Sequence, residues 1–271
     1  MAYLLKQYRK ILAILLTVLI FITGHYGGTL THGENYLFNS NEKANTISSD
    51  TLIGASKIIT QTISNGSDSL TIETHNVYKE AALTPDVGLC CTTNPIWELP
   101  GLKIPKIMQE MNYGCGSTVH ARDLTNNPKM LYVGVGGGME LLQFAYFNRQ
   151  KGGVVGIDVV DEMLEASRKN FMEAEAQNDW FKSEFVDLKK GDAMNLPVED
   201  NSIDVAAQNC LFNIFKADDL KKAIAEMYRV LKPHGRLVMS DPTCEQPMND
   251  ALRNDDRLRA LCLSGSFPIA E

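Results

Sequence analysis

The chain has little positive charge for its length. Its 271 residues include 26 lysines and arginines against 33 aspartates and glutamates, so the formal net charge is −7 at pH 7. An acidic chain repels a phosphate backbone, and the composition therefore disfavours a general nucleic-acid-binding protein. Apolar residues make up 44% and charged residues 22%, which argues against a wholly disordered chain and against a multi-span membrane protein.

Cysteine is scarce as well. Six cysteines in 271 residues are too few for a disulfide scaffold. No C-x-x-C pair is present, which argues against a zinc ribbon, and no C-x-x-C-H motif is present that would attach a c-type haem. The positions of the cysteines are therefore more informative than their number.

The sequence also lacks a long apolar run. Residues 11–23 form an apolar run of 13 residues, whereas a membrane-spanning helix needs roughly 20. A helix over residues 2–23 is just long enough if the basic side chains of residues 6–10 reach the interface, and no A-x-A cleavage site is present. We expect residues 1–38 to form a single-pass membrane anchor, with a signal peptide or an interfacial helix as alternatives. Because the basic residues precede the run, the remainder is placed outside the cytoplasm.

Two polar features follow the apolar run. His25 and His32 lie seven residues apart, and they fit either an interfacial loop or a pair of ligands for haem or a metal. Residues 39–76 are rich in Ser, Thr, Asn and Asp, which predicts a polar linker.

From residue 128 onward, short apolar runs alternate with helical segments. The predicted strands are residues 130–135, 153–159, 184–189, 202–208 and 236–240. The predicted helices are residues 139–147, 161–178 and 218–231. This alternation predicts an α/β fold with a doubly wound, mostly parallel sheet over residues 128–271, preceded by a cysteine-bearing segment over residues 77–127.

Residues suited to ligand binding follow the predicted strands. The glycine-rich turn Gly134 to Gly138 follows the first strand, Asp158 ends the second, and Asp192 and Asn209 follow the third and fourth. The carboxyl ends of parallel strands meet at one edge of a sheet, so these residues are expected to line one site. Glycine lets backbone approach a ligand closely, and an acid after the second strand can bind ribose hydroxyls. The pattern therefore predicts a nucleoside-binding site.

The order of these motifs, closed by Leu231-Lys-Pro-His-Gly235, resembles class I S-adenosylmethionine-dependent methyltransferases. The resemblance implies S-adenosylmethionine as cofactor and a Rossmann-like sheet of seven strands, of which five are visible here, so we expect the domain to be incomplete. The residues it assigns to the cofactor are Tyr113, Gly134, Gly136, Gly138, Asp158, Met163, Asp192, Ala193 and Asn209. The chain departs from the family at Tyr132, where the family usually has an acid, so contacts to the methionine amine are expected from elsewhere.

Three cysteine contexts carry a closer resemblance. The sequences Y-G-C-G at Cys115, Q-N-C before L-F-N at Cys210, and C-L-S-G at Cys262 resemble arsenite S-adenosylmethionine methyltransferases. V-G-L-C-C and residues 99–116 resemble the branch associated with arsenosugar biosynthesis, and the resemblance spans about residues 77–266. It implies that these three thiolates hold trivalent arsenic, a thiophilic centre, for arsenite methylation and detoxification.

The chemistry implied by this resemblance needs no general base. Three sulfur ligands leave the arsenic lone pair free to attack the methyl group, so the step mainly requires positioning. Cys90 or Cys91 matches a mobile cysteine that relays arsenic or forms a disulfide after turnover, and a thiol reductant is the expected co-reactant. The expected substrates are arsenite or its thiol conjugates, and the catalytic domain is expected to be monomeric. Cys244 has no counterpart with a role.

Some expectations conflict. S-adenosylmethionine and reduced thiols are cytosolic, which predicts a cytoplasmic catalytic domain, whereas the N-terminus predicts export. Either the topology inverts or residues 1–76 are foreign to the enzyme. Two other functions stay open: a class I methyltransferase for another small-molecule acceptor, in which the cysteines are structural, and a membrane-tethered metalloid- or haem-binding protein without turnover that uses His25, His32 and the thiols.

Overall fold

The computed structural model describes residues 69–86, 89 and 99–269, which belong to one unit of the chain, Asn65–Glu271. The predicted membrane anchor, most of the predicted linker, and Cys90 and Cys91 lie outside the described residues. Within the described ranges, no helix is long and apolar enough to cross a membrane.

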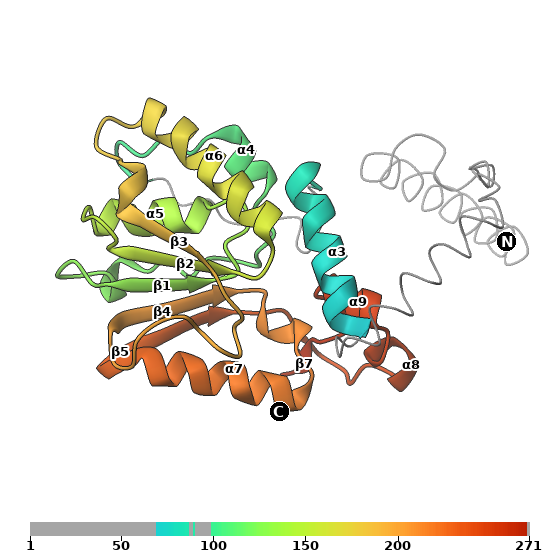
Figure 1. The fold of residues 1–271 in the computed structure, drawn as a ribbon. Helices are drawn as coiled ribbons and strands as arrows, with labels where there is room; N and C mark the ends of the chain where they lie inside the picture. The colour runs from blue at the N-terminus through green and yellow to red at the C-terminus, as the bar shows by residue number, and fades with distance from the viewer. Residues whose placement is uncertain (1–68, 87–88, 90–98, 270–271) are drawn as a thin grey trace, which may run out of the picture. The chain divides into compact units, whose positions relative to one another are not determined.

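A parallel five-stranded sheet forms the centre of this unit (Figure 1). The strands are β1 (Met130–Val133), β2 (Val154–Asp158), β3 (Val186–Lys190), β4 (Ile203–Asn209) and β5 (Leu231–Ser240). Their order is β3-β2-β1-β4-β5. The chain adds β2 and β3 on one side of β1 and then crosses back to add β4 and β5 on the other side, so the strand order reverses between β1 and β4. The predicted doubly wound α/β fold is confirmed, and the five predicted strands are present with shifted ends.

The alternation of side chains along β1 explains how the sheet is covered. Met130 and Tyr132 pack into one apolar cluster, and Leu131 and Val133 pack into another on the opposite face. The three long helices of the sheet are α5 (Met139–Phe147), α6 (Asp161–Gln177) and α7 (Ala217–Val230). Figure 1 shows α5 and α6 on one side of the sheet and α7 on the other. Burial on both faces accounts for the apolar runs of the three central strands, β1, β2 and β4.

The remaining elements, apart from one helix at the start of the described region, are short. They are α4 (Lys106–Glu110), η1 (Ala121–Asp123), η2 (Ser183–Phe185), η3 (Phe212–Ile214), β6 (Thr243–Cys244), α8 (Asp250–Arg253), α9 (Asp256–Ala260) and β7 (Phe267–Pro268). The two short strands pair in parallel as a separate sheet. None of these elements is long enough to carry a clear periodic pattern, so the sequence did not predict them.

The 15-residue helix α3 (Ser69–Leu83) begins inside the segment predicted as a polar linker, so that prediction is wrong for residues 69–76. Only Leu70 and Ala81 of this helix are buried. Two buried positions do not make the apolar stripe by which an amphipathic helix is recognised, which is why the sequence did not reveal it.

Apolar packing of Leu70, Tyr78 and Ala81, together with polar contacts, holds α3 against its neighbours. Lys79 Nζ lies 2.7 Å from Glu162 Oε1 of α6, and the Ser69 hydroxyl donates to the carboxylate of Asp256 in α9. Through these contacts, part of the predicted linker comes to lie against the carboxyl edge of the sheet and contributes to the site.

The segment Leu231–Gly235, predicted as a turn, is the first part of β5. The strand pairs with β4 on both sides of the Lys-Pro-His-Gly sequence, but the register shifts across it. Proline has no N–H to donate, and His234 has a φ of 67°, so regular pairing is interrupted there.

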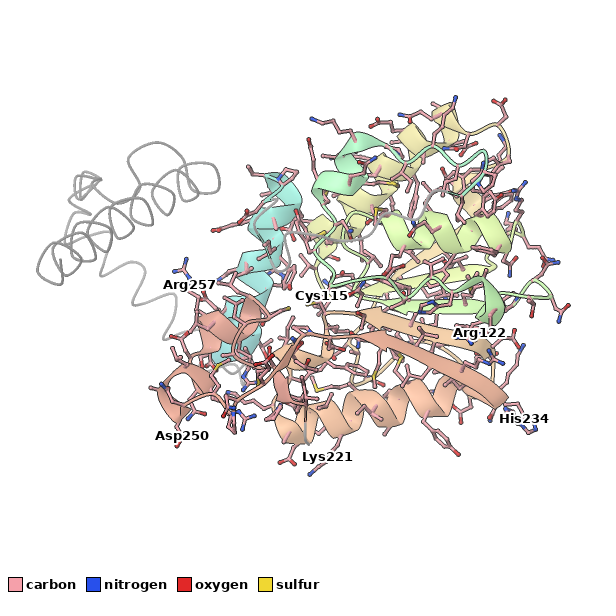
Figure 2. The ribbon with its side chains drawn as sticks, turned by 180° about the vertical axis from the view of Figure 1, so that it is seen from behind. Cys115, Arg122, Lys221, His234, Asp250 and Arg257 are labelled. Atoms are coloured by element: carbon pink, nitrogen blue, oxygen red, sulfur yellow. The ribbon has the colours of Figure 1, made fainter. Side chains whose placement is uncertain are left out.

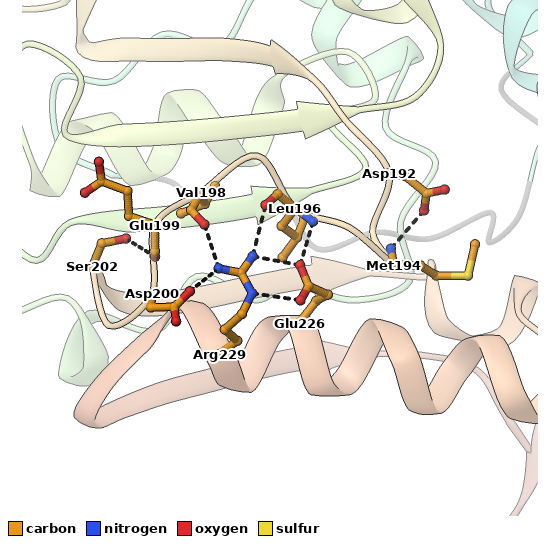
Figure 3. Close-up of polar contacts among 9 residues, drawn as sticks. All are labelled: Asp192, Met194, Leu196, Val198, Glu199, Asp200, Ser202, Glu226 and Arg229. Atoms are coloured by element: carbon orange, nitrogen blue, oxygen red, sulfur yellow. Dashed lines mark hydrogen bonds and ion pairs between the residues drawn. The ribbon is translucent and has the colours of Figure 1, made fainter.

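Arg229 of α7 fixes the connection between β3 and β4 (Figure 3). Its guanidinium donates to the carbonyl oxygens of Leu196 and Val198 at 3.0 and 2.8 Å. It also donates to Asp200 Oδ1 at 2.6 Å and to both carboxylate oxygens of Glu226 at 2.7 Å. The two carboxylates hold the pKa of Arg229 above its ordinary value. The planar guanidinium of arginine has five N–H donors and can make all these contacts at once. A lysine side chain has a single ammonium and cannot reach all of these acceptors.

We therefore expect Arg229→Lys to lower the free energy of unfolding by roughly 1–2 kcal/mol, because the two loop carbonyls lose their donors. Thermal or urea unfolding followed by circular dichroism measures the change. Arg257→Lys is the matched control, since Arg257 lies on the surface of α9, is 78% exposed and makes one ion pair at 3.9 Å (Figure 2). Equal stability of the two variants would contradict the role of Arg229.

Candidate active site

A cavity of about 210 Å³ opens at the carboxyl ends of β1, β2, β3 and β4. It lies where the strand order reverses, which is the usual ligand site in an open α/β sheet. Eight of the nine predicted cofactor residues line it: Tyr113, Gly134, Gly136, Asp158, Met163, Asp192, Ala193 and Asn209. Helix α3 closes one side with Leu70, Thr71, Thr74, His75 and Tyr78.

Gly138 is the predicted cofactor residue that does not line the cavity. It has a φ of 85°, and a Cβ placed there would lie 2.9 Å from Phe171 Cζ. This glycine therefore allows α5 to start close against α6, and its requirement is one of packing.

The glycine-rich turn leaves room for a ligand. Gly134 has a φ of 83°, which favours glycine, and a Cβ there would have no neighbour closer than the Leu211 methyl carbons at 3.9 Å. Because Gly134 lines the cavity, such a Cβ would take up space that is open to a ligand. The turn itself is anchored by the Gly137 N–H, which donates to the Met111 carbonyl at 3.1 Å.

Asp158, at the end of β2, presents its carboxylate to the cavity. The backbone N–H of Val135 donates to one oxygen at 3.0 Å, and that of Val160 donates to the other at 2.9 Å. Burial raises the pKa of Asp158 to about 6, although these N–H groups act in the opposite direction. Each oxygen keeps a further lone pair, so the pair of oxygens fits the two hydroxyls of a ribose.

The β3–β4 connection supplies the next wall of the cavity. Asp192 Oδ1 accepts from the Met194 N–H at 2.8 Å, which closes a tight turn that brings Ala193 and Met194 to the lining (Figure 3). The contacts of Arg229 hold this connection at its far end. This wall consists of the apolar side chains of Ala193 and Met194 and the carboxylate of Asp192. Such a surface suits a flat nucleoside base, which packs on apolar groups and hydrogen-bonds at its edge.

Three cysteines meet beside this cavity. Cys115, labelled in Figure 2, packs with Cys210 and Cys262 in one buried cluster that also contains Leu70 and Ile214. The sulfurs of Cys115 and Cys210 lie 2.9 Å apart. Cys115 is disulfide-bonded in this structure, whereas Cys210 and Cys262 are not part of a disulfide.

The contacts of Cys262 differ from those of Cys115 and Cys210. Cys262 Sγ donates to the Cys210 carbonyl oxygen at 2.9 Å and lies 3.4 Å from the hydroxyl of Tyr78. Among the residues that the structure describes, no group of three His, Cys, Asp or Glu side chains is arranged to hold a metal ion. The predicted thiols are thus brought together but do not form a three-sulfur site in this oxidised state.

The backbone at two of these cysteines is unusual. Cys210 has a φ of 62° and Cys262 a φ of 59°, in the left-handed region that side chains other than glycine, asparagine and aspartate rarely adopt. Such conformations cost about 1–3 kcal/mol and cluster at functional sites. Cys244 lies apart from the three and donates to the Ser266 carbonyl at 3.5 Å, so the structure gives it no place in the cluster.

Asn209 links the cysteine loop to the sheet. Its side-chain oxygen accepts from the Cys115 N–H at 2.6 Å, and its amide nitrogen donates to the Gly116 carbonyl at 3.3 Å. A Cβ on Gly114 would lie 2.5 Å from Asn209 Nδ2, so only glycine permits this approach. The preceding Tyr113 donates to the Ala81 carbonyl at 2.8 Å, and burial raises its pKa to about 12.

Glu140 is a cavity residue that sequence reasoning missed. Its side chain is only 5% exposed, and one oxygen accepts from the Thr118 N–H at 2.7 Å and the Ser117 hydroxyl at 3.1 Å. The other accepts from the Tyr132 hydroxyl at 2.5 Å and the Asn209 amide at 3.1 Å. Burial, followed by the nearby charge of Glu140, holds the pKa of Tyr132 well above its ordinary range. The only signal in the sequence is an acid at the second position of the helix after the glycine turn.

Comparison with known proteins agrees with this geometry. Residues 131–239 match the family model described as a methyltransferase domain. The chain is 28% identical over 160 residues to an arsenite methyltransferase of Halobacterium salinarum, covering 59% of this chain and 39% of that protein. It is 30% identical over 184 residues to an arsenite methyltransferase of Aquipseudomonas alcaligenes, covering 66% and 51%. An arsenite methyltransferase of Mus musculus is 29% identical over 158 residues, covering 57% and 41%.

A solved structure shares the fold. The arsenic(III) S-adenosylmethionine methyltransferase of Chlamydomonas reinhardtii superposes with a TM-score of 0.55 at 24% identity, covering 63% of this chain and 57% of that one. The chain spans between about two fifths and one half of the length of the curated relatives above. The match of residues 131–239 to a methyltransferase domain and the fold shared with this solved structure agree with each other.

We expect the affinity for S-adenosylhomocysteine, measured by titration calorimetry, to fall as the pH is lowered from about 7.5 to about 5. The free protein binds a proton at Asp158 with a pKa of about 6, and the protonated carboxyl loses acceptor capacity for the ribose hydroxyls.

Asp158→Asn is the control for this dependence. It is expected to weaken binding about tenfold and to flatten the pH profile, while it keeps His75 in the cavity wall. A pH dependence that persists in Asp158→Asn would assign the titration to another group.

Proposed function

We propose that the chain is an S-adenosylmethionine-dependent methyltransferase that transfers a methyl group to trivalent arsenic. The observation that carries the proposal is the pair of buried sulfurs, Cys115 Sγ and Cys210 Sγ, 2.9 Å apart beside a cavity that fits a nucleoside. The three curated relatives described above are named arsenite methyltransferases, which supports the same substrate. Trivalent arsenic prefers thiolate ligands, which the cluster supplies.

The cofactor lies along the cavity in this proposal. Asp158 accepts the ribose hydroxyls, Ala193 and Met163 flank the adenine, and the turn at Gly134 leaves space for the amino-acid end. S-adenosylmethionine supplies an electrophilic methyl group on a sulfonium. Cys210 lines the same cavity, so a substrate atom held by its sulfur is directed toward that methyl group.

Reduction of Cys115 is the first step in this proposal. A thiol reductant gives two electrons to the disulfide of Cys115 and is itself oxidised, and two thiols result. Cys262 then gives up its contact with the Cys210 carbonyl and binds arsenic: an As–S bond replaces an As–O bond of arsenite, and the thiol proton leaves with the displaced hydroxyl as water. Cys90 or Cys91, which lie outside the described residues, remain the proposed relay for arsenic from arsenite or its thiol conjugates.

The methyl transfer itself places few demands on the protein. The arsenic lone pair forms the As–C bond, and the electron pair of the broken C–S bond stays on sulfur, which leaves as neutral S-adenosylhomocysteine. No residue has to remove a proton in this step, so the contribution of the chain is to hold the two partners in line and to exclude water. The buried cluster around the thiols supplies that exclusion.

Incubation of the full chain with arsenite, a thiol reductant and methyl-labelled S-adenosylmethionine tests the proposal. We expect arsenite-dependent release of S-adenosylhomocysteine and labelled methylated arsenic on speciation. Cys210→Ser is expected to lower this rate by about 100-fold, since arsenic is then no longer held in line.

Cys244→Ser is the matched control, because Cys244 lies outside the cluster and its rate should equal that of the unsubstituted chain. Release of S-adenosylhomocysteine with another small acceptor, at a rate unchanged in Cys210→Ser, would replace arsenic with that acceptor and make the cysteines structural.

A further inference from the structure

Glu140 is a buried carboxylate that has no basic partner among the residues that the structure describes. Both of its oxygens accept hydrogen bonds and neither donates, which is the pattern of the ionised form. None of the ion pairs in the described part of the chain includes Glu140. A buried charge that is compensated only by neutral donors is costly, and a cationic ligand would lower that cost.

The charge of the cavity also favours a cationic ligand. Its described lining includes four carboxylates, those of Glu140, Asp158, Asp192 and Asp219, and it includes neither lysine nor arginine. A low-dielectric cavity lined by one sign of charge favours a ligand of the opposite sign. The ligand proposed above carries a sulfonium and an ammonium.

The strand order locates Glu140 relative to the nucleoside. Asp158 ends β2 and Asp192 follows β3 at one end of the cavity, whereas Asn209 ends β4 and Cys210 follows it at the other. Glu140 is hydrogen-bonded to Asn209 and therefore belongs to the second end. A ligand whose ribose lies at Asp158 directs its amino-acid end toward Glu140.

The four hydrogen bonds to Glu140 decide how it can act. They use the lone pairs of both carboxylate oxygens, so a direct bond to an ammonium is not available without loss of one of them. The Tyr132 hydroxyl, however, donates its only proton to Glu140, which leaves its own oxygen as an acceptor. Tyr132 lines the cavity and stands two residues before Gly134.

We propose that Tyr132 and Glu140 together bind the ammonium of the cofactor's amino-acid end. Tyr132 accepts the hydrogen bond, and Glu140 acts as a positioning residue that fixes the hydroxyl proton and supplies the negative charge. The pair thus performs the task of an acid at position 132. This inference rests on the proposed cofactor.

Titration calorimetry on the full chain with two probes tests the pair. The probes are S-adenosylhomocysteine and its analogue in which hydrogen replaces the α-amino group. We expect the unsubstituted protein to prefer S-adenosylhomocysteine by about tenfold or more, as close buried charge pairs do. Tyr132→Phe and Glu140→Gln are each expected to weaken binding of S-adenosylhomocysteine by about that factor and to leave the desamino analogue unchanged, which removes the preference.

The second probe separates a recognition role from a structural one. Loss of affinity for both probes in equal proportion would make Glu140 and Tyr132 structural and overturn the inference, as would equal binding of both probes by the unsubstituted protein. Tyr132→Phe keeps the ring that packs against Phe144, so it decides the matter if Glu140→Gln does not fold. Asp158→Asn is the control that should weaken both probes equally.

Failure of the proposed function gives a different result. If the unsubstituted chain binds neither S-adenosylhomocysteine nor the desamino analogue, the cofactor itself is wrong and the inference falls with it. If it binds both without preference, the cofactor stands and only the role of Tyr132 and Glu140 is overturned.

Discussion

The amide of Asn209 is the contact on which the site depends. Its oxygen holds the backbone of Cys115, and its nitrogen holds both Gly116 and Glu140. Asn209 is the last residue of β4, so a single planar side chain transmits the position of the sheet to the cysteine loop and to the carboxylate under the glycine turn. Hydrogen bonds in a buried network strengthen one another, and the loss of one leaves its partners unsatisfied.

This arrangement places two kinds of chemistry at adjoining ends of one cavity. Asp158 lies at the end that suits a nucleoside, and Cys210 lies at the end that suits a thiophilic acceptor. Cys210 and Cys262 occupy left-handed backbone conformations, which the surrounding packing must stabilise. The strain is consistent with a cluster that is held in place for ligand binding and is not simply a part of the apolar core.

The central strands β1, β2 and β4 were predictable because they are buried on both faces. Runs such as Met130–Val133 are apolar throughout, and the polar or glycine residues that follow them mark the carboxyl edge. Helix α3 was not predictable, because it is held by contacts such as Lys79–Glu162 and buries only two residues. Periodicity does not report such long-range polar contacts.

The same limit applies to the site. Glycines and acids at strand ends could be assigned by position, whereas the role of Glu140 depends on four donors from other segments, Ser117, Thr118, Tyr132 and Asn209. Tyr132 appeared as a departure from the family pattern, and only the structure shows the carboxylate against its hydroxyl. Likewise, the hydrogen bond from the Cys262 thiol to the Cys210 carbonyl follows from tertiary packing, and no local sequence pattern predicts it.

We infer that Asn209 couples the nucleoside-binding end of the cavity to the thiol cluster. Titration calorimetry of Asn209→Ala with arsenite under reducing conditions, and with S-adenosylhomocysteine, tests it most directly. The account predicts that both affinities fall by about tenfold or more in a variant that remains folded by circular dichroism. Arsenite affinity equal to that of the unsubstituted chain would contradict the account.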